Sequence, residues 1–168
     1  MSLLDDVSIV VTPNGYKAGE LYAVVPTEVL GSEQVTNGDF ATDTDWTKGT
    51  GWTISGGSAN SDGTQASVSP MYQDCGIVLG KRYQVVYTVT SYTAGSVRVY
   101  LGGASSGAVS RSASGTYTQE FTALGNQWVT FEADASFIGS IDNASIKENI
   151  SADMDVTRAT AATRVDEN

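Results

Sequence analysis

The sequence predicts an all-β fold, an antiparallel sandwich of two sheets, from three observations. The 168-residue chain contains 18 glycines and 8 tyrosines among many Thr, Ser and Val residues, a composition typical of strands joined by tight turns. Its short apolar runs alternate with polar residues at a period of two, and no helical period occurs. Gly, Asn and Asp separate these runs at the spacing of sandwich strands, which favours a jelly roll.

The first 30 residues predict an extended N-terminal β-arm. Two apolar runs, residues 7–11 (VSIVV) and 20–25 (ELYAVV), flank a turn at residues 13–15 (PNG). Asn and Gly suit such a turn because both tolerate positive φ. An isolated two-stranded hairpin is only marginally stable in water, so we expect the arm to lie against another surface.

Residues 33–148 predict the body of the sandwich. The clearest strand is 82–92 (RYQVVYTVTSY), in which the residues that face the core recur at every second position. Near the end of the body, 127–135 (QWVTFEADA) shows the same alternation. The other predicted strands are residues 51–55, 64–73, 96–101, 116–124 and 141–148.

Residues 150–168 form a third segment, a C-terminal tail. It is rich in small and polar residues and contains a near repeat, TRAT followed by ATR, that includes Arg158 and Arg164. These two arginines would lie on different faces of a helix but would align on an extended strand. We expect this segment to be extended or irregular chain that packs on a partner, or the start of a further domain.

The charge of the chain disfavours two classes of partner. Nine basic residues face 19 acidic ones, for a net charge of −10. A nucleic-acid-binding protein needs a cationic surface, and anionic lipid attracts basic segments. No apolar run approaches the length of a membrane span. We therefore expect neither a nucleic acid nor a membrane as partner.

The composition also argues against catalysis. Histidine is absent, which removes the usual general base near neutral pH and the commonest zinc ligand. The single cysteine, Cys75, cannot form an intrachain disulfide and is most simply a small buried apolar residue. No pair of acids is singled out by its spacing. The sequence predicts that this protein is not an enzyme.

Three motifs in the central segment resemble carbohydrate-binding-module-like jelly rolls of the family 4/9 type. These are residues 35–46 (VTNGDFATDTDW), 79–89 (LGKRYQVVYTV) and 139–148 (GSIDNASIKE). The resemblance implies the jelly-roll fold for residues 33–148. It is a weaker sign of sugar binding, because one fold can host many functions.

The flanks carry a second resemblance, to phage virion fibre or appendage proteins, through residues 1–26 and 155–168 (DVTRATAATRVDEN). It implies a structural protein of the virion: a head or tail fibre, a capsid decoration or another appendage. The terminal segments would anchor the chain to capsid, portal or tail proteins, and the jelly roll would project. Such proteins are commonly homo-oligomers, often trimers. Their longer relatives continue past this point, so the chain is either a short member or the front of a longer protein.

The family 4/9 resemblance also implies a structural calcium ion between the first and last strands of the body. Asp39 and Asp142 would be the side-chain ligands, and Asn37 would contribute a backbone oxygen. One carboxylate is missing, because Ala41 stands where the family often has glutamate. The alternative is that Asp142 and the following asparagine hydrogen-bond the backbone of the turn.

Three aromatic residues are the candidate sugar-binding side chains. Tyr100 and Trp128 lie opposite the apolar residues of their predicted strands, and Trp52 lies beside a Gly-rich turn. Aromatic faces can stack on the C–H surfaces of pyranose rings. The alternative is that another surface covers these residues, as we expect for Trp46 in the core. A carbohydrate-binding adhesion module for host-surface or environmental glycans is therefore the second functional hypothesis, beside the virion role.

Overall fold

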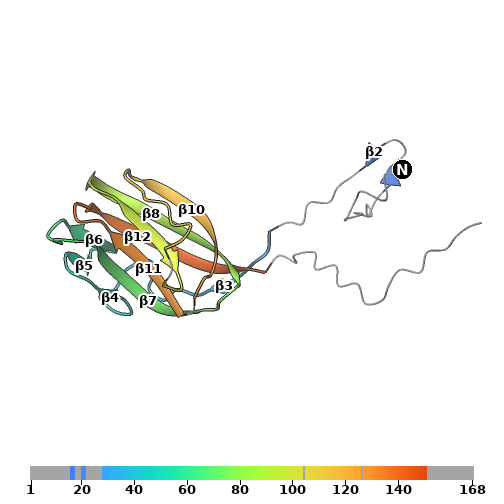
Figure 1. Ribbon diagram of the computed structural model, residues 1–168, viewed down its shortest axis with the longest axis horizontal. Helices are drawn as coiled ribbons and strands as arrows, with labels where there is room; N and C mark the ends of the chain where they lie inside the picture. Colours follow the sequence, from blue (N-terminus) through green and yellow to red (C-terminus); the bar gives the residue numbers. More distant parts are fainter. Residues whose placement is uncertain (1–15, 18–19, 22–27, 104, 126, 151–168) are drawn as a thin grey trace, which may run out of the picture. The chain divides into compact units, whose positions relative to one another are not determined.

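The computed structural model describes residues 16–17, 20–21, 28–103, 105–125 and 127–150 (Figure 1). The chain divides into two units, and the larger one is Val29–Ile150. Most of the predicted N-terminal arm and nearly all of the predicted tail, with Arg158 and Arg164, lie outside the described residues. Within the described ranges there is no helix that could span a membrane.

The strands are β1 (Tyr16–Lys17), β2 (Glu20–Leu21), β3 (Leu30–Glu33), β4 (Thr47–Lys48), β5 (Trp52–Ser55), β6 (Ser58–Asp62), β7 (Ser69–Ile77), β8 (Arg82–Ala94), β9 (Val97–Leu101), β10 (Gly115–Thr122), β11 (Gln127–Ala133) and β12 (Ile138–Asn149). β1 and β2 pair antiparallel, with Tyr16 opposite Leu21. This pairing corrects the prediction for the arm, which placed Tyr16 in the connection between two strands.

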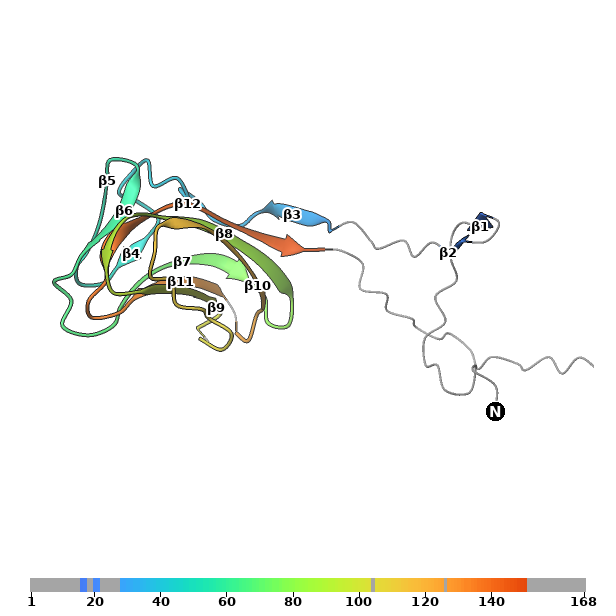
Figure 2. The ribbon, with the colours of Figure 1, turned by 90° about the horizontal axis from the view of Figure 1, so that it is seen from above.

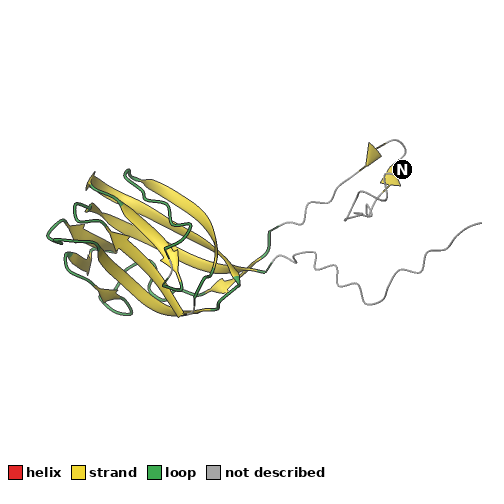
Figure 3. Ribbon diagram, viewed as in Figure 1, coloured by secondary structure: helices red, strands yellow, loops and turns green. Residues whose placement is uncertain are grey.

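Two antiparallel sheets make up the body. One has the strand order β10-β8-β12-β6-β5, with β3 also paired to β12, and the other has the order β4-β7-β11-β9. Figure 2 shows the two layers, with β7 and β11 beneath β8 and β12. The described part of the chain consists of strands and loops (Figure 3). The predicted all-β jelly-roll sandwich is thus confirmed.

The core lies between the sheets and follows the predicted alternation. On β8, Tyr83, Val85, Tyr87 and Val89 are all buried. Trp46 is also buried, as predicted, and its ring lies 5.8 Å from that of Phe131 on β11. The prediction missed β6, because its sequence (SANSD) has no apolar alternation to reveal that Ala59 and Ser61 point inward.

A bulge in β12 joins the last strand to the turn at residues 37–40. The register against β8 shifts between Asp142 and Ser145, and Asn143 has a φ of 52°. The N–H of Ala144 thereby donates a hydrogen bond to the carbonyl of Gly38 at 2.8 Å. A Cβ at Gly38 would lie 2.0 Å from the Ala144 carbonyl oxygen, so this close approach requires glycine.

Candidate functional site

Three aromatic side chains lie together on the outer surface of the β4-β7-β11-β9 sheet. The register places Thr130 between Tyr72 and Tyr100, in one row across the three strands. Trp128 lies two residues before Thr130 on the same face of β11, with 36% of its surface exposed. Its ring meets that of Tyr72 edge to face, with centroids 5.2 Å apart. We call Tyr72, Tyr100 and Trp128 the aromatic face.

The alternation along β11 explains why these groups point outward. Val129, Phe131 and Ala133 are fully buried between the sheets. Residues of a strand point alternately to its two faces, so Trp128 and Glu132 emerge on the opposite side. The side chains of β7 and β9 that oppose them in register therefore share that outer surface.

Glu132 is the polar centre of this surface. Its Oε1 accepts hydrogen bonds from Arg98 Nε at 2.8 Å and Nη2 at 2.5 Å. Its Oε2 accepts a hydrogen bond from the Tyr100 hydroxyl at 3.2 Å. The Glu132 side chain is 14% exposed, so this ion pair is better shielded from water than an ordinary surface pair. Burial, followed by the Glu132 charge, raises the pKa of Tyr100, which therefore stays a hydroxyl donor at neutral pH.

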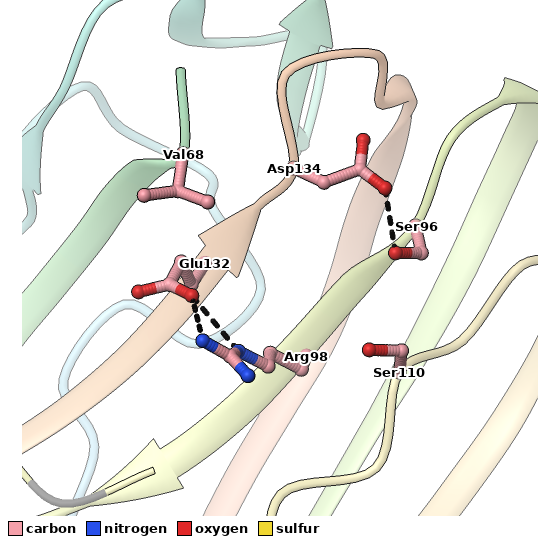
Figure 4. A pocket seen from close by; sticks show the side chains of 6 residues that line it. All are labelled: Val68, Ser96, Arg98, Ser110, Glu132 and Asp134. Carbon is pink, nitrogen blue, oxygen red and sulfur yellow. Dashed lines mark hydrogen bonds and ion pairs between the residues drawn. The ribbon is translucent and has the colours of Figure 1, made fainter.

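A pocket of about 200 Å³ lies beyond Glu132, at the end of the sheet away from Trp128 (Figure 4). Asp134 Oδ2 accepts a hydrogen bond from the Ser96 hydroxyl at 2.7 Å, and Asp134 Oδ1 accepts one from the Ser136 N–H at 2.8 Å. The lining residues are Val68, Ser96, Arg98, Ser110, Glu132 and Asp134. Glu132 thus borders both the pocket and the aromatic face.

This arrangement combines flat apolar ring surfaces with hydrogen-bonding groups of both kinds. Ligand sites of this type use apolar and aromatic groups for contact area and a few polar groups for orientation. The pocket is smaller than the roughly 300–1,000 Å³ typical of sites for drug-sized molecules. The surface is therefore suited to binding a partly apolar, hydroxyl-rich ligand across an open sheet.

The structure brings together two of the three predicted sugar-binding residues and excludes the third. Tyr100 and Trp128 lie on the aromatic face, as expected from their positions opposite the apolar residues. Trp52 is only 5% exposed, and its Nε1 donates a hydrogen bond to the Ser69 carbonyl at 3.1 Å. Trp52 packs in the core near Phe137, with the ring centroids 6.1 Å apart, so it has no open face for a sugar.

Tyr72 is a site residue that sequence reasoning missed. Its position in residues 64–73 fits alternation, because Met71 and Gln73 beside it are buried. The signal was therefore present in the sequence, but Pro70 within the same run obscured the strand.

The residues proposed to bind calcium lie on two segments that do meet, through the Gly38–Ala144 hydrogen bond. The Asn37 carbonyl, however, already accepts hydrogen bonds from Phe40 N at 3.2 Å and Trp46 Nε1 at 3.1 Å. A calcium site that uses Asn37 would have to displace one of these bonds, so this carbonyl fits the ion poorly.

The two acids of the proposed calcium site stabilise their own turns. Asp39 Oδ1 accepts a hydrogen bond from Ala41 N at 3.4 Å, and Asp142 Oδ1 accepts one from Asn143 N at 2.6 Å. Among the described residues, no three acidic or cysteine side chains gather in a way that could hold a metal ion. The calcium site stays a prediction.

Comparison with known proteins gives similarity of structure alone. No protein-family model matches the sequence, and no curated protein matches it. An arabinose-bound MgGH51 α-L-arabinofuranosidase is similar over 71% of this chain, with 11% identity and a TM-score of 0.53. Bacteriophage CBA120 tailspike protein 4, in its enzymatically active domain, is similar over 69%, with 14% identity and a TM-score of 0.49.

The CBM4 carbohydrate-binding module is a third similar structure, over 67% of this chain, with 15% identity and a TM-score of 0.48. The match covers 98% of that module, but only 27% of the arabinofuranosidase and 21% of the tailspike domain. At these identities the likeness concerns the fold, and the arabinofuranosidase match supports the sandwich described above.

Proposed function

We propose that the body of this protein, Val29–Ile150, is a carbohydrate-binding domain whose ligand lies on the aromatic face. The observation that carries the proposal is that Tyr72, Tyr100 and Trp128 share the outer surface of one sheet, with the rings of Tyr72 and Trp128 in contact. An aromatic cluster on a surface marks a site of interaction, because its burial by a ligand is favourable. The C–H faces of pyranose rings provide flat apolar surfaces of a matching kind.

The polar neighbours of the aromatic face supply what a sugar's hydroxyl groups need. Glu132 offers acceptor capacity, Arg98 offers donors, and both are already held in place by their mutual hydrogen bonds. Preorganised polar groups lose less conformational freedom when a ligand binds. A glycan could thus stack on Trp128 and exchange hydrogen bonds with the Glu132–Arg98 pair.

We propose further that the domain binds without catalysis. The chain has no histidine, and at the proposed site the Glu132 carboxylate is engaged by Arg98 and Tyr100. Both oxygens of this carboxylate are therefore committed to fixing the Arg98 and Tyr100 side chains, which suits a positioning role. Both features favour recognition over acid–base chemistry.

Carbohydrate binding is the second hypothesis from the sequence, behind a structural role in a phage virion. The aromatic face supports carbohydrate binding better than it supports the virion role. The virion role depends on residues 1–30 and 150–168, which lie almost entirely outside the described residues. The virion role is supported by the sequence resemblance of these terminal segments to phage fibre or appendage proteins. Anchoring to a capsid, portal or tail, a trimeric state and a location on the virion accordingly stay predictions. The two proposals are compatible, since an adhesive domain can be carried by a virion protein.

A glycan array probed with the full chain and with Trp128→Ala tests the proposal. We expect the wild-type chain to bind a subset of glycans and Trp128→Ala to lose at least about fivefold in affinity, since the loss of stacking on one aromatic ring costs on the order of 1–3 kcal/mol. Leu124→Ala is the control, because Leu124 is 54% exposed on the loop before β11, outside the aromatic face. Equal binding by Trp128→Ala, or no binding by the wild type across the array, would refute the proposal.

A further inference from the structure

The pocket beyond Glu132 continues the outer surface that carries the aromatic face. Ala133 is fully buried between the sheets, so Glu132 and Asp134 on either side of it point outward. The register places Glu132 opposite Arg98, and the Asp134 N–H donates a hydrogen bond to the Ser96 carbonyl at 2.9 Å. Glu132 and Asp134 are therefore two successive outward positions, each with a neighbour on or beside β9.

Two segments line the sides of the pocket. Val68 precedes the buried Ser69 of β7, and 57% of the Val68 surface is exposed. On the other side, Arg111 forms an isolated bridge with Val97, which brings the neighbouring Ser110 alongside β9. The pocket thus has one apolar side and one hydroxyl-bearing side, with the acidic groups between them (Figure 4).

Asp134 gives the pocket a negative charge that no described cation balances. Arg98 is paired with Glu132, and no ion pair within the described ranges includes Asp134. The Asp134 carboxylate accepts hydrogen bonds from two neutral groups, the Ser96 hydroxyl and the Ser136 N–H. A carboxylate has about four lone-pair sites, so roughly half of them are open to a ligand.

We propose that this pocket binds the ammonium group of an amino sugar, which makes glycans with free amino groups the preferred ligands of the domain. The inference rests on the carbohydrate binding proposed above. An ammonium group donates charge-assisted hydrogen bonds, which are about twice as strong as the neutral ones that a hydroxyl group would give Asp134. The pocket, at about 200 Å³, is too small for a glycan chain but suits one substituent of a sugar ring.

The same charge disfavours acidic sugars. A uronic acid in the pocket would place its carboxylate beside Asp134, and opposed like charges are costly when partly shielded from water. Arg98, the cation of the pocket, is already engaged by Glu132 through both of its hydrogen bonds. The net charge of the chain, −10, extends the repulsion to longer range and attracts a cationic ligand.

Titration of the full chain with D-glucosamine, D-glucose and D-glucuronate tests the pocket, because the first and third sugars each differ from glucose at a single carbon. Backbone amide chemical shifts in NMR spectra report the binding. We expect saturable shifts at Ser96 and Asp134 with glucosamine, at least about tenfold weaker binding of glucose, and no binding of glucuronate. The preference for glucosamine should decrease as the salt concentration rises.

Asp134→Asn removes the charge but keeps the shape and an acceptor oxygen for the Ser136 N–H. We expect this variant to bind glucosamine and glucose alike. Asp62→Asn is the matched control and should retain the preference of the wild type. The Asp62 carboxylate also accepts hydrogen bonds from a hydroxyl and a backbone N–H, both of Thr64, but Asp62 lies on β6 in the other sheet.

The outcomes separate this inference from the proposed function. The amino-sugar assignment is overturned by the lack of a saturable response to glucosamine, by equal affinity for glucose, or by an unchanged preference in Asp134→Asn. Any of these results would leave the aromatic face standing if Trp128→Ala still weakened glycan binding on the array. Conversely, a glucosamine response at Ser96 and Asp134, with array binding unaffected by Trp128→Ala, would support the pocket and refute the aromatic face.

Discussion

Glu33 Oε1 accepts a hydrogen bond from the backbone N–H of Ile146 at 2.7 Å, although the two residues are 113 positions apart. The other carboxylate oxygen accepts a hydrogen bond from the Ser145 hydroxyl at 2.6 Å. The register between β3 and β12 shifts between Lys147 and Asn149. The carboxylate therefore holds the first strand of the body against the last one at a place where their pairing is irregular.

Replacing Glu33 with alanine should loosen β3. The change removes both acceptors and leaves the Ile146 N–H without its partner, so we expect a loss of about 1–3 kcal/mol in the free energy of unfolding. Urea denaturation measures this loss, and hydrogen exchange should accelerate at Ile146. Glu120→Ala, on the exposed face of β10, is the matched control. Equal stability of the two variants would contradict the role given to Glu33.

Gln73 joins β7 to the loop that follows β3. Its Oε1 accepts a hydrogen bond from Thr36 N at 2.8 Å, and its Nε2 donates to the Thr36 carbonyl at 2.9 Å and to the Asp45 carbonyl at 3.2 Å. Gln73→Leu keeps the approximate volume but leaves these backbone groups unpaired, so we expect a loss of about 2–4 kcal/mol. If the urea midpoint of Gln73→Leu equals that of the wild type, water must satisfy these backbone groups as well as the Gln73 amide does.

The thiol of Cys75 should react slowly. Burial chiefly, with the charges of Asp74 and Glu33, raises the pKa of this thiol to about 11. Since the thiolate is the nucleophile, alkylation by iodoacetamide at pH 8 should be roughly 100-fold slower than that of a free cysteine and should keep rising up to about pH 11. A rate that levels off near pH 9 would mean that the thiol is more open to water than its packing indicates.

The same shift gives Cys75 a pH-dependent contribution to stability. A thiol whose folded pKa is raised favours the folded state fully below its unfolded pKa. This contribution is lost as the pH rises from about 9 through about 11, because the unfolded chain ionises first. Urea unfolding of Cys75→Ala should therefore show a smaller decline over this interval than that of the wild type. Parallel declines would contradict the assignment.

Glu132 should control the affinity of the proposed glycan site. Glu132→Gln keeps the shape of the side chain but weakens the hydrogen bonds that hold Arg98 and Tyr100. We expect about tenfold weaker binding of a glycan identified on the array, measured by titration calorimetry, with a loss of stability of about 1–3 kcal/mol. Glu120→Gln, on the other sheet, should bind like the wild type. Unchanged affinity in Glu132→Gln would place the ligand elsewhere.

Most of the fold could be predicted from the sequence because the dominant strands alternate strongly. Val85 and Val89 on β8, or Val129 and Phe131 on β11, define an inward face without further information. The same rule places Trp52 with Ile54 on the buried side of β5. The Gly-rich turn beside Trp52 does not indicate exposure, because the alternation along β5 decides which way the side chain points.

The polar connections could not be predicted in this way. Glu33 acts on a strand 113 positions away, and Gln73 acts on residues 37 and 28 positions away. No local pattern marks such pairs, because each looks like an ordinary surface residue until the strands are assembled. The aromatic face could be predicted only in part, because it too depends on how the strands are assembled. Alternation shows which rings point outward, but only strand order shows that Tyr72 and Trp128 are neighbours.

β12 is the last strand of the body in the sequence, yet it lies between β8 and β6 in its sheet. During synthesis, a nascent chain that ends before residue 138 lacks the strand that pairs with both β8 and β6. One edge of each of these strands would then have no partner. Unpaired edges of this kind invite association with other chains. Closure of the domain must therefore wait until β12 has left the ribosome, and the long-range contacts that it then makes favour slow folding.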